Sequence, residues 1–214
     1  MLNMTDLNIM ADKQKIGVFG GAFNPVHNGH INLALHYLNE LELDKVLFIP
    51  TASPPHKSDD DFAPKEDRIN MLSLAISSFD KFEISDIEFK LTGKSYTYLT
   101  LSELEKIYEN AEFYLIIGAD QMLHFDKWYK YKEILSLVTL CTSAREDEKE
   151  KAEILSFASR LDGLDMNKFK LLTSPVLKVS SSEIRQKIKD GEDFSSLVPK
   201  KVYDYIIKRR IYNV

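Results

Sequence analysis

The chain has 214 residues and a formal charge of −5 at pH 7; 44% of its residues are hydrophobic and 29% are charged. These proportions are typical of a globular chain with a sizeable core, and they exclude a disordered protein. The negative balance argues against a general nucleic-acid binder, which usually carries a basic field. We predict one main domain over residues 15–214, preceded by a loose extension over residues 1–14.

The cysteine content and the hydropathy pattern indicate the cellular compartment and limit the possible binding partners. The single cysteine, Cys141, permits no internal disulfide bond and no cysteine-based zinc cluster, as is typical of a reducing cytoplasm. The first residues lack the apolar stretch of a signal peptide, and no apolar run approaches a membrane span. We therefore expect a cytoplasmic protein with neither nucleic acid nor membrane as a partner. The number of subunits stays open, a homo-oligomer included.

Short apolar runs alternate with longer helical patterns along the chain. We predict strands over residues 15–19, 45–50, 113–118, 137–142 and 169–173, and helices over 29–41, 65–79, 96–109, 181–189 and 199–209. Residues 82–91 are a weaker pattern that favours an edge hairpin. Strands separated by helices pair in parallel through right-handed crossovers. The prediction is an α/β fold with a doubly wound, mostly parallel sheet and a small helical C-terminal part, whose ligand cleft lies beyond the strand ends.

The segment GGAFNPVHNGH, residues 20–30, follows the first strand. Gly20 and Gly21 allow backbone angles and close approach that a side chain would forbid, so amides of the turn can bind a phosphate. The three-residue spacing of His27 and His30 puts two cationisable imidazoles on one side of the next helix, where they can stabilise charge on a transferring phosphate. The alternatives are an ordinary glycine turn, a metal site or surface histidines.

Three further segments have both a structural and a functional interpretation. Ser180 and Glu183 form a capping-box pattern worth about 1 kcal/mol, whereas Arg185, one turn into the helix, can reach an anion at that helix start. The loop TASPPHK, residues 51–57, is either a solvated tip or a stiffened carrier of positive charge at His56 and Lys57. Trp128, the only tryptophan, is either a core residue or an aromatic face for a ring.

Together these motifs resemble the nucleotidyltransferase superfamily and, more narrowly, the bacterial nicotinate-nucleotide adenylyltransferases, over about residues 15–212. The resemblance implies a Rossmann-like fold that transfers AMP from ATP to nicotinate mononucleotide, giving deamido-NAD and pyrophosphate in NAD biosynthesis. It implies Mg²⁺ with ATP and no metal ligands from the protein. It also implies catalytic roles for His27, His30, Lys57 and Arg185.

The resemblance further assigns the binding residues. ATP is expected to contact Gly20, Gly21, Ala22, Phe23, His30, Gly118, Asp120, Ser181, Ser182 and Arg185. Nicotinate mononucleotide is expected to contact Asn24, Lys57, Ser95, Tyr96, Thr97 and Trp128. Asn24 and Ala22 stand where many members carry Asp and Thr. The family's Arg-Pro-Gly is replaced by SARED at residues 143–147, where Arg145 keeps the charge but loses the rigid turn.

Three alternatives remain at this point. A phosphopantetheine adenylyltransferase shares the histidine motif, although it would not explain residues 95–97 together with Trp128. A nucleotide-sensing module could keep the fold without turnover, although both histidines and Arg185 argue against it. A hydrolytic zinc site could use His27, His30, His36 and His56, although the chain lacks a glutamate-flanked HxxxH helix.

Overall fold

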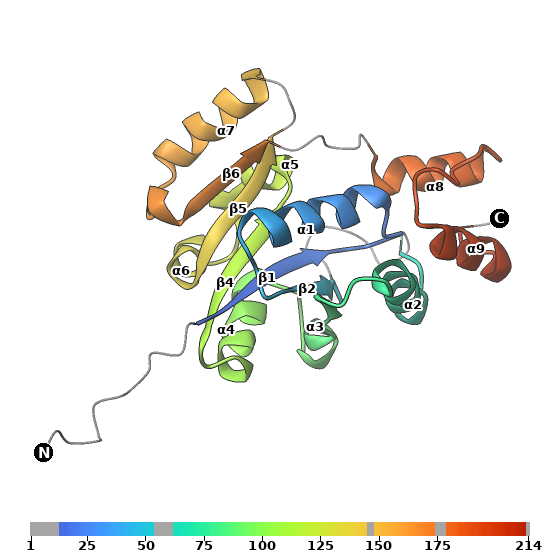
Figure 1. Ribbon diagram of the computed structural model, residues 1–214, viewed down its shortest axis with the longest axis horizontal. Coiled ribbons are helices and arrows are strands. Elements are labelled where there is room, and N and C mark those ends of the chain that lie inside the picture. Colours follow the sequence, from blue (N-terminus) through green and yellow to red (C-terminus); the bar gives the residue numbers. More distant parts are fainter. Residues whose placement is uncertain (1–12, 54–61, 145–147, 174–178, 213–214) are drawn as a thin grey trace, which may run out of the picture.

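A computed structural model of the chain describes residues 13–53, 62–144, 148–173 and 179–212. Its sheet has six strands: β1 (Gln14–Gly21), β2 (Lys45–Pro50), β3 (Phe82–Ile84), β4 (Ala111–Ile117), β5 (Val138–Ala144) and β6 (Phe169–Thr173). The strand order is β3-β2-β1-β4-β5-β6, and every pair is parallel. The predicted doubly wound fold is confirmed (Figure 1).

The predicted edge hairpin over residues 82–91 is wrong. β3 is a three-residue strand that pairs in parallel with β2, and the short helix α3 (Ile87–Lys90) follows it. The crossover helix α2 (Lys65–Ile76) returns the chain to the same end of the sheet, so β3 enters in the same direction as β2.

Five of the longer helices agree with the predicted ranges: α1 (Asn28–Glu40), α2, α4 (Thr97–Ile107), α8 (Ser181–Lys189) and α9 (Lys200–Arg209). The sixth, α7 (Glu148–Arg160), was not among the predicted helices. The sequence missed the shorter elements α5 (Ala119–Met122), η2 (Phe125–Lys127), α6 (Tyr131–Leu137) and η3 (Met166–Lys168). Elements of one or two turns are too short for a helical period to emerge. None of the helices in the described ranges combines the length and the apolar character needed to cross a membrane.

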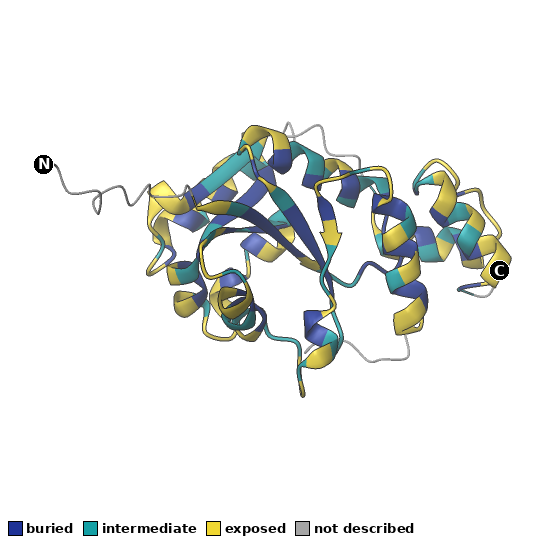
Figure 2. Ribbon diagram, turned by 60° about the horizontal axis from the view of Figure 1, so that its bottom comes forward, coloured by how far each residue is buried: buried dark blue, intermediate teal, exposed yellow. Residues whose placement is uncertain are grey.

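Both faces of the sheet are buried, and β2 shows how the sequence achieves this. Val46 and Phe48 join a core beneath α1, α2, α8 and α9, while Leu47 and Ile49 join a second core on the opposite face beneath α4, α6 and α7. Successive strand residues point to opposite faces, so a continuous apolar run supplies two cores at once. Figure 2 shows these buried strands between the helical layers.

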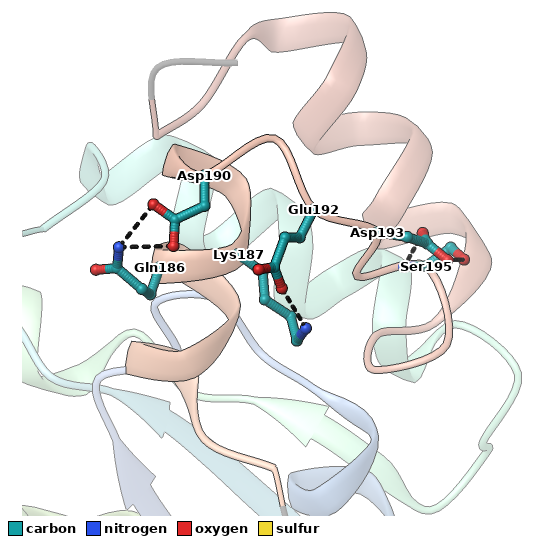
Figure 3. A network of polar contacts seen from close by, with 6 residues as sticks. All are labelled: Gln186, Lys187, Asp190, Glu192, Asp193 and Ser195. Carbon is teal, nitrogen blue, oxygen red and sulfur yellow. Dashed lines mark hydrogen bonds and ion pairs between the residues drawn. The ribbon is translucent and has the colours of Figure 1, made fainter.

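The C-terminal helices α8 and α9 lie at one end of the molecule, where α9 packs against α2 (Figure 1). Polar contacts fix the turn between them: Lys187 pairs with Glu192 at 2.7 Å, and Gln186 donates to Asp190 at 2.9 Å (Figure 3). This turn is followed by residues that contact α1, since the backbone N–H of Asn28 donates to Leu197 O at 3.0 Å. The small helical C-terminal part is therefore attached to the start of α1.

Candidate active site

The chain order of the strands reverses between β1 and β4, and ligands of doubly wound sheets bind at the carboxyl ends of strands at such a switch point. The segment between β1 and α1 lies at this edge. It contains a cis peptide bond between Asn24 and Pro25 and a positive φ of 46° at Phe23. The histidine motif thus lies where the fold places ligands.

The two glycines that end β1 have other backbone angles than the sequence predicted. Neither has a positive φ, and both continue the extended strand, so the expected special backbone angles are wrong at Gly20 and Gly21. A Cβ on Gly21 would lie 3.2 Å from the ring of Phe23, which is fully buried. A Cβ on Gly20 would meet no atom within 4 Å. Space beside Gly20 is open to another molecule, which keeps the close-approach prediction for this glycine.

His27 and His30 cap helix α1 reciprocally. The backbone N–H of His27 donates to Nδ1 of His30 at 3.2 Å, and the backbone N–H of His30 donates to Nδ1 of His27 at 3.3 Å. The two rings stack with centroids 3.6 Å apart. A capping box normally uses a hydroxyl and a carboxylate, so here the capping groups are the imidazoles themselves. Their orientation is therefore fixed before any ligand binds.

Burial favours the neutral form of both histidines, which the sequence identified only as cationisable. Burial lowers the pKa of His27 from 6.5 to about 4, although its backbone hydrogen bond acts in the opposite direction. Burial, followed by the charge of His27, lowers the pKa of His30 well below 6.5. Because each Nδ1 accepts a hydrogen bond, the single proton of each neutral ring lies on Nε2. The pair thus offers two neutral N–H donors.

Gly29, between the two histidines, was not assigned a role from the sequence. A Cβ at this position would lie 2.9 Å from Val179 Cγ1 and 3.1 Å from His27 Nδ1. Contacts below 3.0 Å require something to move, so only glycine allows the His27 ring and the approach to α8 to coexist. The glycine of the HxGH spacing is the signal that identifies this position.

The start of α8 contacts the same segment. Ser181 donates to Pro25 O at 2.9 Å, and Arg185 Nη1 donates to Asn24 O at 2.8 Å. Arg185 also lies 3.4 Å from the hydroxyl of Ser182. The predicted N-cap is confirmed, since Ser180 accepts from the N–H of Glu183 at 3.1 Å. The structure therefore brings Ser181 and Arg185 to the histidine segment, across sequence separations of 156 and 161 residues.

Asn24 is a point of connection rather than an open side chain. It is buried, and its Oδ1 accepts from the N–H of Ala63 at 2.9 Å and from the hydroxyl of Tyr212 at 2.7 Å. The predicted substrate contact of Asn24 stays a prediction. Its observed contacts hold the histidine segment to the approach of α2 and to the C-terminal residues.

Arg68 on α2 is a buried cation that the sequence argument missed. Its Nη1 donates to Ala22 O at 3.0 Å and to Thr51 O at 2.8 Å, and its guanidinium lies 5.3 Å from the centre of the Phe62 ring. It thereby joins the segments that follow β1 and β2. A single arginine in a charged helix start carries no sequence signal for this role.

Residues 95–97 lie beside the end of β2. The N–H of Ser53 donates to Ser95 Oγ at 3.1 Å, and the N–H of Ser95 donates to Ser53 O at 2.9 Å. Tyr96, not Ser95, is the N-cap of α4, and its side chain forms no capping hydrogen bond. No side chain at the N-cap therefore occupies the first amide groups of α4. An anion that binds at this helix start needs these amide groups to be free of such a cap.

Glu88 was also missed, and it connects the same elements. Its buried carboxylate accepts from the hydroxyl of Thr100 at 3.0 Å and from the N–H of Ala52 at 3.3 Å. Burial raises the pKa of Glu88, while hydrogen bonds from Ser95 and Thr100 lower it. The carboxylate thus holds α4 against the loop that follows β2.

Trp128 lies near residues 95–97 through a neighbouring tyrosine. Its ring packs on Phe125 with centroids 5.0 Å apart, and it is partly buried. The next residue, Tyr129, is 47% exposed and lies 4.7 Å from the ring of Tyr96. The segment that contains Trp128 is therefore linked to residues 95–97 through the ring contact between Tyr129 and Tyr96.

Gly118 and Asp120 follow β4, across the switch point from the histidine segment. Gly118 is the N-cap of α5, and a Cβ on it would lie 2.7 Å from Asp120 Oδ1. Glycine is therefore needed for the Asp120 carboxylate to lie over this turn. Asp120 is exposed, and its predicted ribose contact is compatible with that position.

The remaining assigned residues cannot be placed. Lys57, His56 and Arg145 lie outside the described residues. Within the described ranges, no group of three or more His, Cys, Asp or Glu side chains is arranged to hold a metal ion.

Comparison with known proteins defines the class. Residues 18–187 match the cytidylyltransferase-like family, and the chain belongs to it. More narrowly, it belongs with the nicotinate-nucleotide adenylyltransferases. A protein from Clostridium tetani named as a probable nicotinate-nucleotide adenylyltransferase is 42% identical over 212 residues, which cover 93% of this chain and 99% of that protein. A protein of the same name from Clostridium acetobutylicum is 38% identical, with 93% and 99% covered.

Solved structures share the fold. The nicotinic acid mononucleotide adenylyltransferase of Plasmodium falciparum, complexed with NaAD, has a TM-score of 0.75 at 20% identity and covers 94% of this chain and 98% of its own. A putative nicotinate-nucleotide adenylyltransferase from Vibrio parahaemolyticus has a TM-score of 0.68 at 23% identity, with 94% and 96% covered. At these identities the likeness concerns the fold alone.

Proposed function

We propose that the chain transfers the AMP unit of ATP to nicotinate mononucleotide, forming deamido-NAD and pyrophosphate. The observation that carries this proposal is the reciprocally bonded pair His27 and His30 at the switch point, with Arg185 hydrogen-bonded to the same segment. Membership among the nicotinate-nucleotide adenylyltransferases supports the choice of substrates.

The reaction needs alignment and charge stabilisation more than a strong base. An oxygen of the mononucleotide's 5′-phosphate attacks the α-phosphorus of ATP, a new P–O–P linkage forms, and the bond to pyrophosphate breaks. The nucleophile is already ionised, so no covalent enzyme intermediate is required. Two polyanions must be held in line while charge is redistributed towards the departing phosphates.

The neutral histidines suit this task. In our proposal, the Nε2–H groups of His27 and His30 donate to oxygens of the α-phosphate, and the reciprocal bonds at Nδ1 keep these donors aimed without further reorganisation. Arg185, Ser181 and Ser182 hold the β- and γ-phosphates that leave as pyrophosphate. Lys57 is proposed to reduce repulsion between the two reactants.

The nucleoside groups are assigned to the rest of the carboxyl edge. The backbone beside Gly20, Gly21, Ala22 and Phe23, together with Gly118 and Asp120, is proposed to contact ATP. A Cβ on Gly20 would meet no protein atom within 4 Å, so the space beside it is open to a ligand. The amides that begin α4, at Ser95, Tyr96 and Thr97, are proposed to bind the pyridine carboxylate, and Trp128 to stack on its ring. The segment that contains the buried Asn24 is proposed to contact the mononucleotide.

We further propose that Mg²⁺ enters with ATP, held mainly by phosphate oxygens, which are the hard ligands this ion prefers. A cytoplasmic location follows from the substrates that this activity requires.

A substrate panel tests the proposed function. Pyrophosphate release is measured with ATP or CTP as donor and with nicotinate mononucleotide, its amide or phosphopantetheine as acceptor. We expect the highest kcat/KM with ATP and nicotinate mononucleotide. A preference for phosphopantetheine would favour the related adenylyltransferase, and ATP binding without any pyrophosphate release would favour a sensing module. Metal analysis after chelation tests the zinc alternative.

A further inference from the structure

The last described residue of the chain reaches the histidine segment. Tyr212, partly buried, donates its hydroxyl to Asn24 Oδ1 at 2.7 Å, one of the shortest hydrogen bonds between distant parts of the chain. The same oxygen accepts from the N–H of Ala63, and the carbonyl of the same asparagine accepts from Arg185. One residue thus receives hydrogen bonds from the C-terminal part, from the approach to α2 and from α8.

The helix that precedes Tyr212 is held in place by contacts that do not involve Asn24. The preceding helix α9 is attached to α2 because Tyr205 donates to Asp67 at 2.8 Å and Arg209 pairs with Asp67 at 3.4 Å. Ile206 and Ile211 are buried in the core that also contains Phe23. Loss of the Tyr212 hydroxyl therefore leaves α9 docked.

The hydroxyl is suited to donate rather than to ionise. Burial raises the pKa of Tyr212, and although Arg185 and Arg68 lower it, the shift remains upward. The group therefore stays protonated at neutral pH. Both arginines thus act electrostatically on the Tyr212 hydroxyl, and both also donate to backbone carbonyls of the histidine segment.

We propose that Tyr212 is a positioning residue for AMP transfer: by holding Asn24, it sets the placement of the His27 and His30 pair relative to Arg185. This inference rests on the proposed function and adds to it a residue that is assigned to neither substrate and acts through Asn24. Displacement of about 1 Å can cost up to about 10²-fold in rate, so one anchoring hydrogen bond can matter at a distance.

The test uses the full chain with Tyr212→Phe, which removes the hydroxyl and keeps the ring. We expect kcat to fall about tenfold and KM for nicotinate mononucleotide to change by a smaller factor, since Asn24 is only one of the proposed mononucleotide contacts and residues 95–97 are held separately. The matched control is Tyr205→Phe, which removes the hydroxyl that binds Asp67 and Asn70. It should lower the melting temperature by a similar amount and leave kcat unchanged.

A double-mutant cycle separates positioning from general stability. If Tyr212 acts through Asn24, Tyr212→Phe causes no further loss of kcat in an Asn24→Ala background. Equal loss in both backgrounds, or a kcat for Tyr212→Phe within twofold of the unaltered chain, overturns the proposal.

ATP affinity, measured by calorimetry, keeps this inference separate from the proposed function. If the unaltered chain shows no turnover of nicotinate mononucleotide, the proposed function fails. The positioning role then still requires Tyr212→Phe to weaken ATP binding severalfold relative to Tyr205→Phe. Equal ATP affinity in these two variants would reject it.

Discussion

The two sides of the candidate site differ in how completely they are built before a ligand binds. The proposed phosphate side, residues 22–30 with 181–185, has buried His27 and Asn24 and hydrogen bonds from three distant parts of the chain. The proposed pyridine side, residues 95–98 with 125–130, presents a 47% exposed Tyr129 and a partly buried Trp128. The residues of the phosphate side are fixed by contacts within the protein, whereas the aromatic rings of the pyridine side are partly exposed to solvent.

This difference follows the demands of the chemistry. Stabilising charge in a transition state requires donors that are oriented in advance, because reorganisation during the reaction costs free energy. Binding a flat ring requires exposed aromatic surface and amides, which gain most of their contacts when the ligand arrives. Substitutions on the phosphate side should therefore change turnover, and those on the pyridine side should change affinity.

The largest effect is expected for His30→Ala. Loss of one preorganised donor should slow turnover about 10²-fold or more, as pyrophosphate release will measure. Circular dichroism should show that the fold is kept, although loss of the His30 cap on α1 should cost about 1 kcal/mol of stability. His36→Ala is the matched control, because His36 lies on the same helix and its buried Nε2 has no partner among the described residues. Near-normal turnover in His30→Ala would contradict the claim that the phosphate side controls turnover.

A second test uses pH to probe how firmly the histidine pair is built. The folded pKa of His27 is about 4, below its usual 6.5, so the folded state binds fewer protons than the unfolded state in this window. The contribution to stability is therefore complete above pH 6.5 and is lost as pH falls towards 4. Between pH 7 and pH 5, His27 should account for about 2 kcal/mol of the loss.

Denaturant unfolding at both pH values measures this linkage. In His27→Asn, the amide oxygen can still cap α1 but does not titrate, so the pH-dependent loss should shrink by about that amount. The pKa of His30 is also lowered, so the pH-dependent loss of stability that His30 causes should remain in this variant. An unchanged pH dependence would mean that His27 is not held as a neutral, buried cap.

The third test asks whether the open space beside Gly20 belongs to ATP. Gly20→Ala adds a Cβ that meets no protein atom, so the melting temperature should hold while ATP affinity falls about tenfold. Gly29→Ala gives the opposite pattern, because its Cβ would lie 2.9 Å from Val179 and destabilise the fold by about 1–3 kcal/mol. Unchanged ATP affinity in Gly20→Ala would remove the backbone of β1 from the binding site.

The smallest effect concerns the pyridine side. Trp128→Ala should raise KM for nicotinate mononucleotide about fivefold, equivalent to about 1 kcal/mol of stacking, with kcat nearly unchanged. Trp128→Phe, which keeps an aromatic face, should recover most of the loss. Steady-state kinetics with ATP saturating provides the measurement, and a fall in kcat without a change in KM would place Trp128 outside the pyridine site.

Much of the fold followed from the sequence because its apolar runs and helical periods are long. The strand over Lys45–Pro50 and the helix over Ser181–Lys189 have the predicted bounds. The parallel edge strand β3 was missed because three residues cannot show a strand period. Short elements are set by tertiary contacts rather than by local pattern.

Sequence spacing identified candidate site residues, but it did not reveal their charge state or their contacts. The spacing of His27 and His30 located the pair, yet their neutral state depends on burial and on reciprocal bonds that no spacing reveals. Arg68 and Tyr212 were missed because their partners, Ala22, Thr51 and Asn24, lie far away in sequence. Contacts of this kind become visible only when the fold brings the segments together.

The central claim is that two neutral imidazoles, fixed in advance, meet the reacting phosphate. A crystal structure of the chain with bound deamido-NAD tests it most directly. We predict that the Nε2 atoms of His27 and His30 lie within about 3.2 Å of oxygens on the linked phosphates. A dinucleotide whose phosphate linkage lies out of reach of both rings would contradict the account.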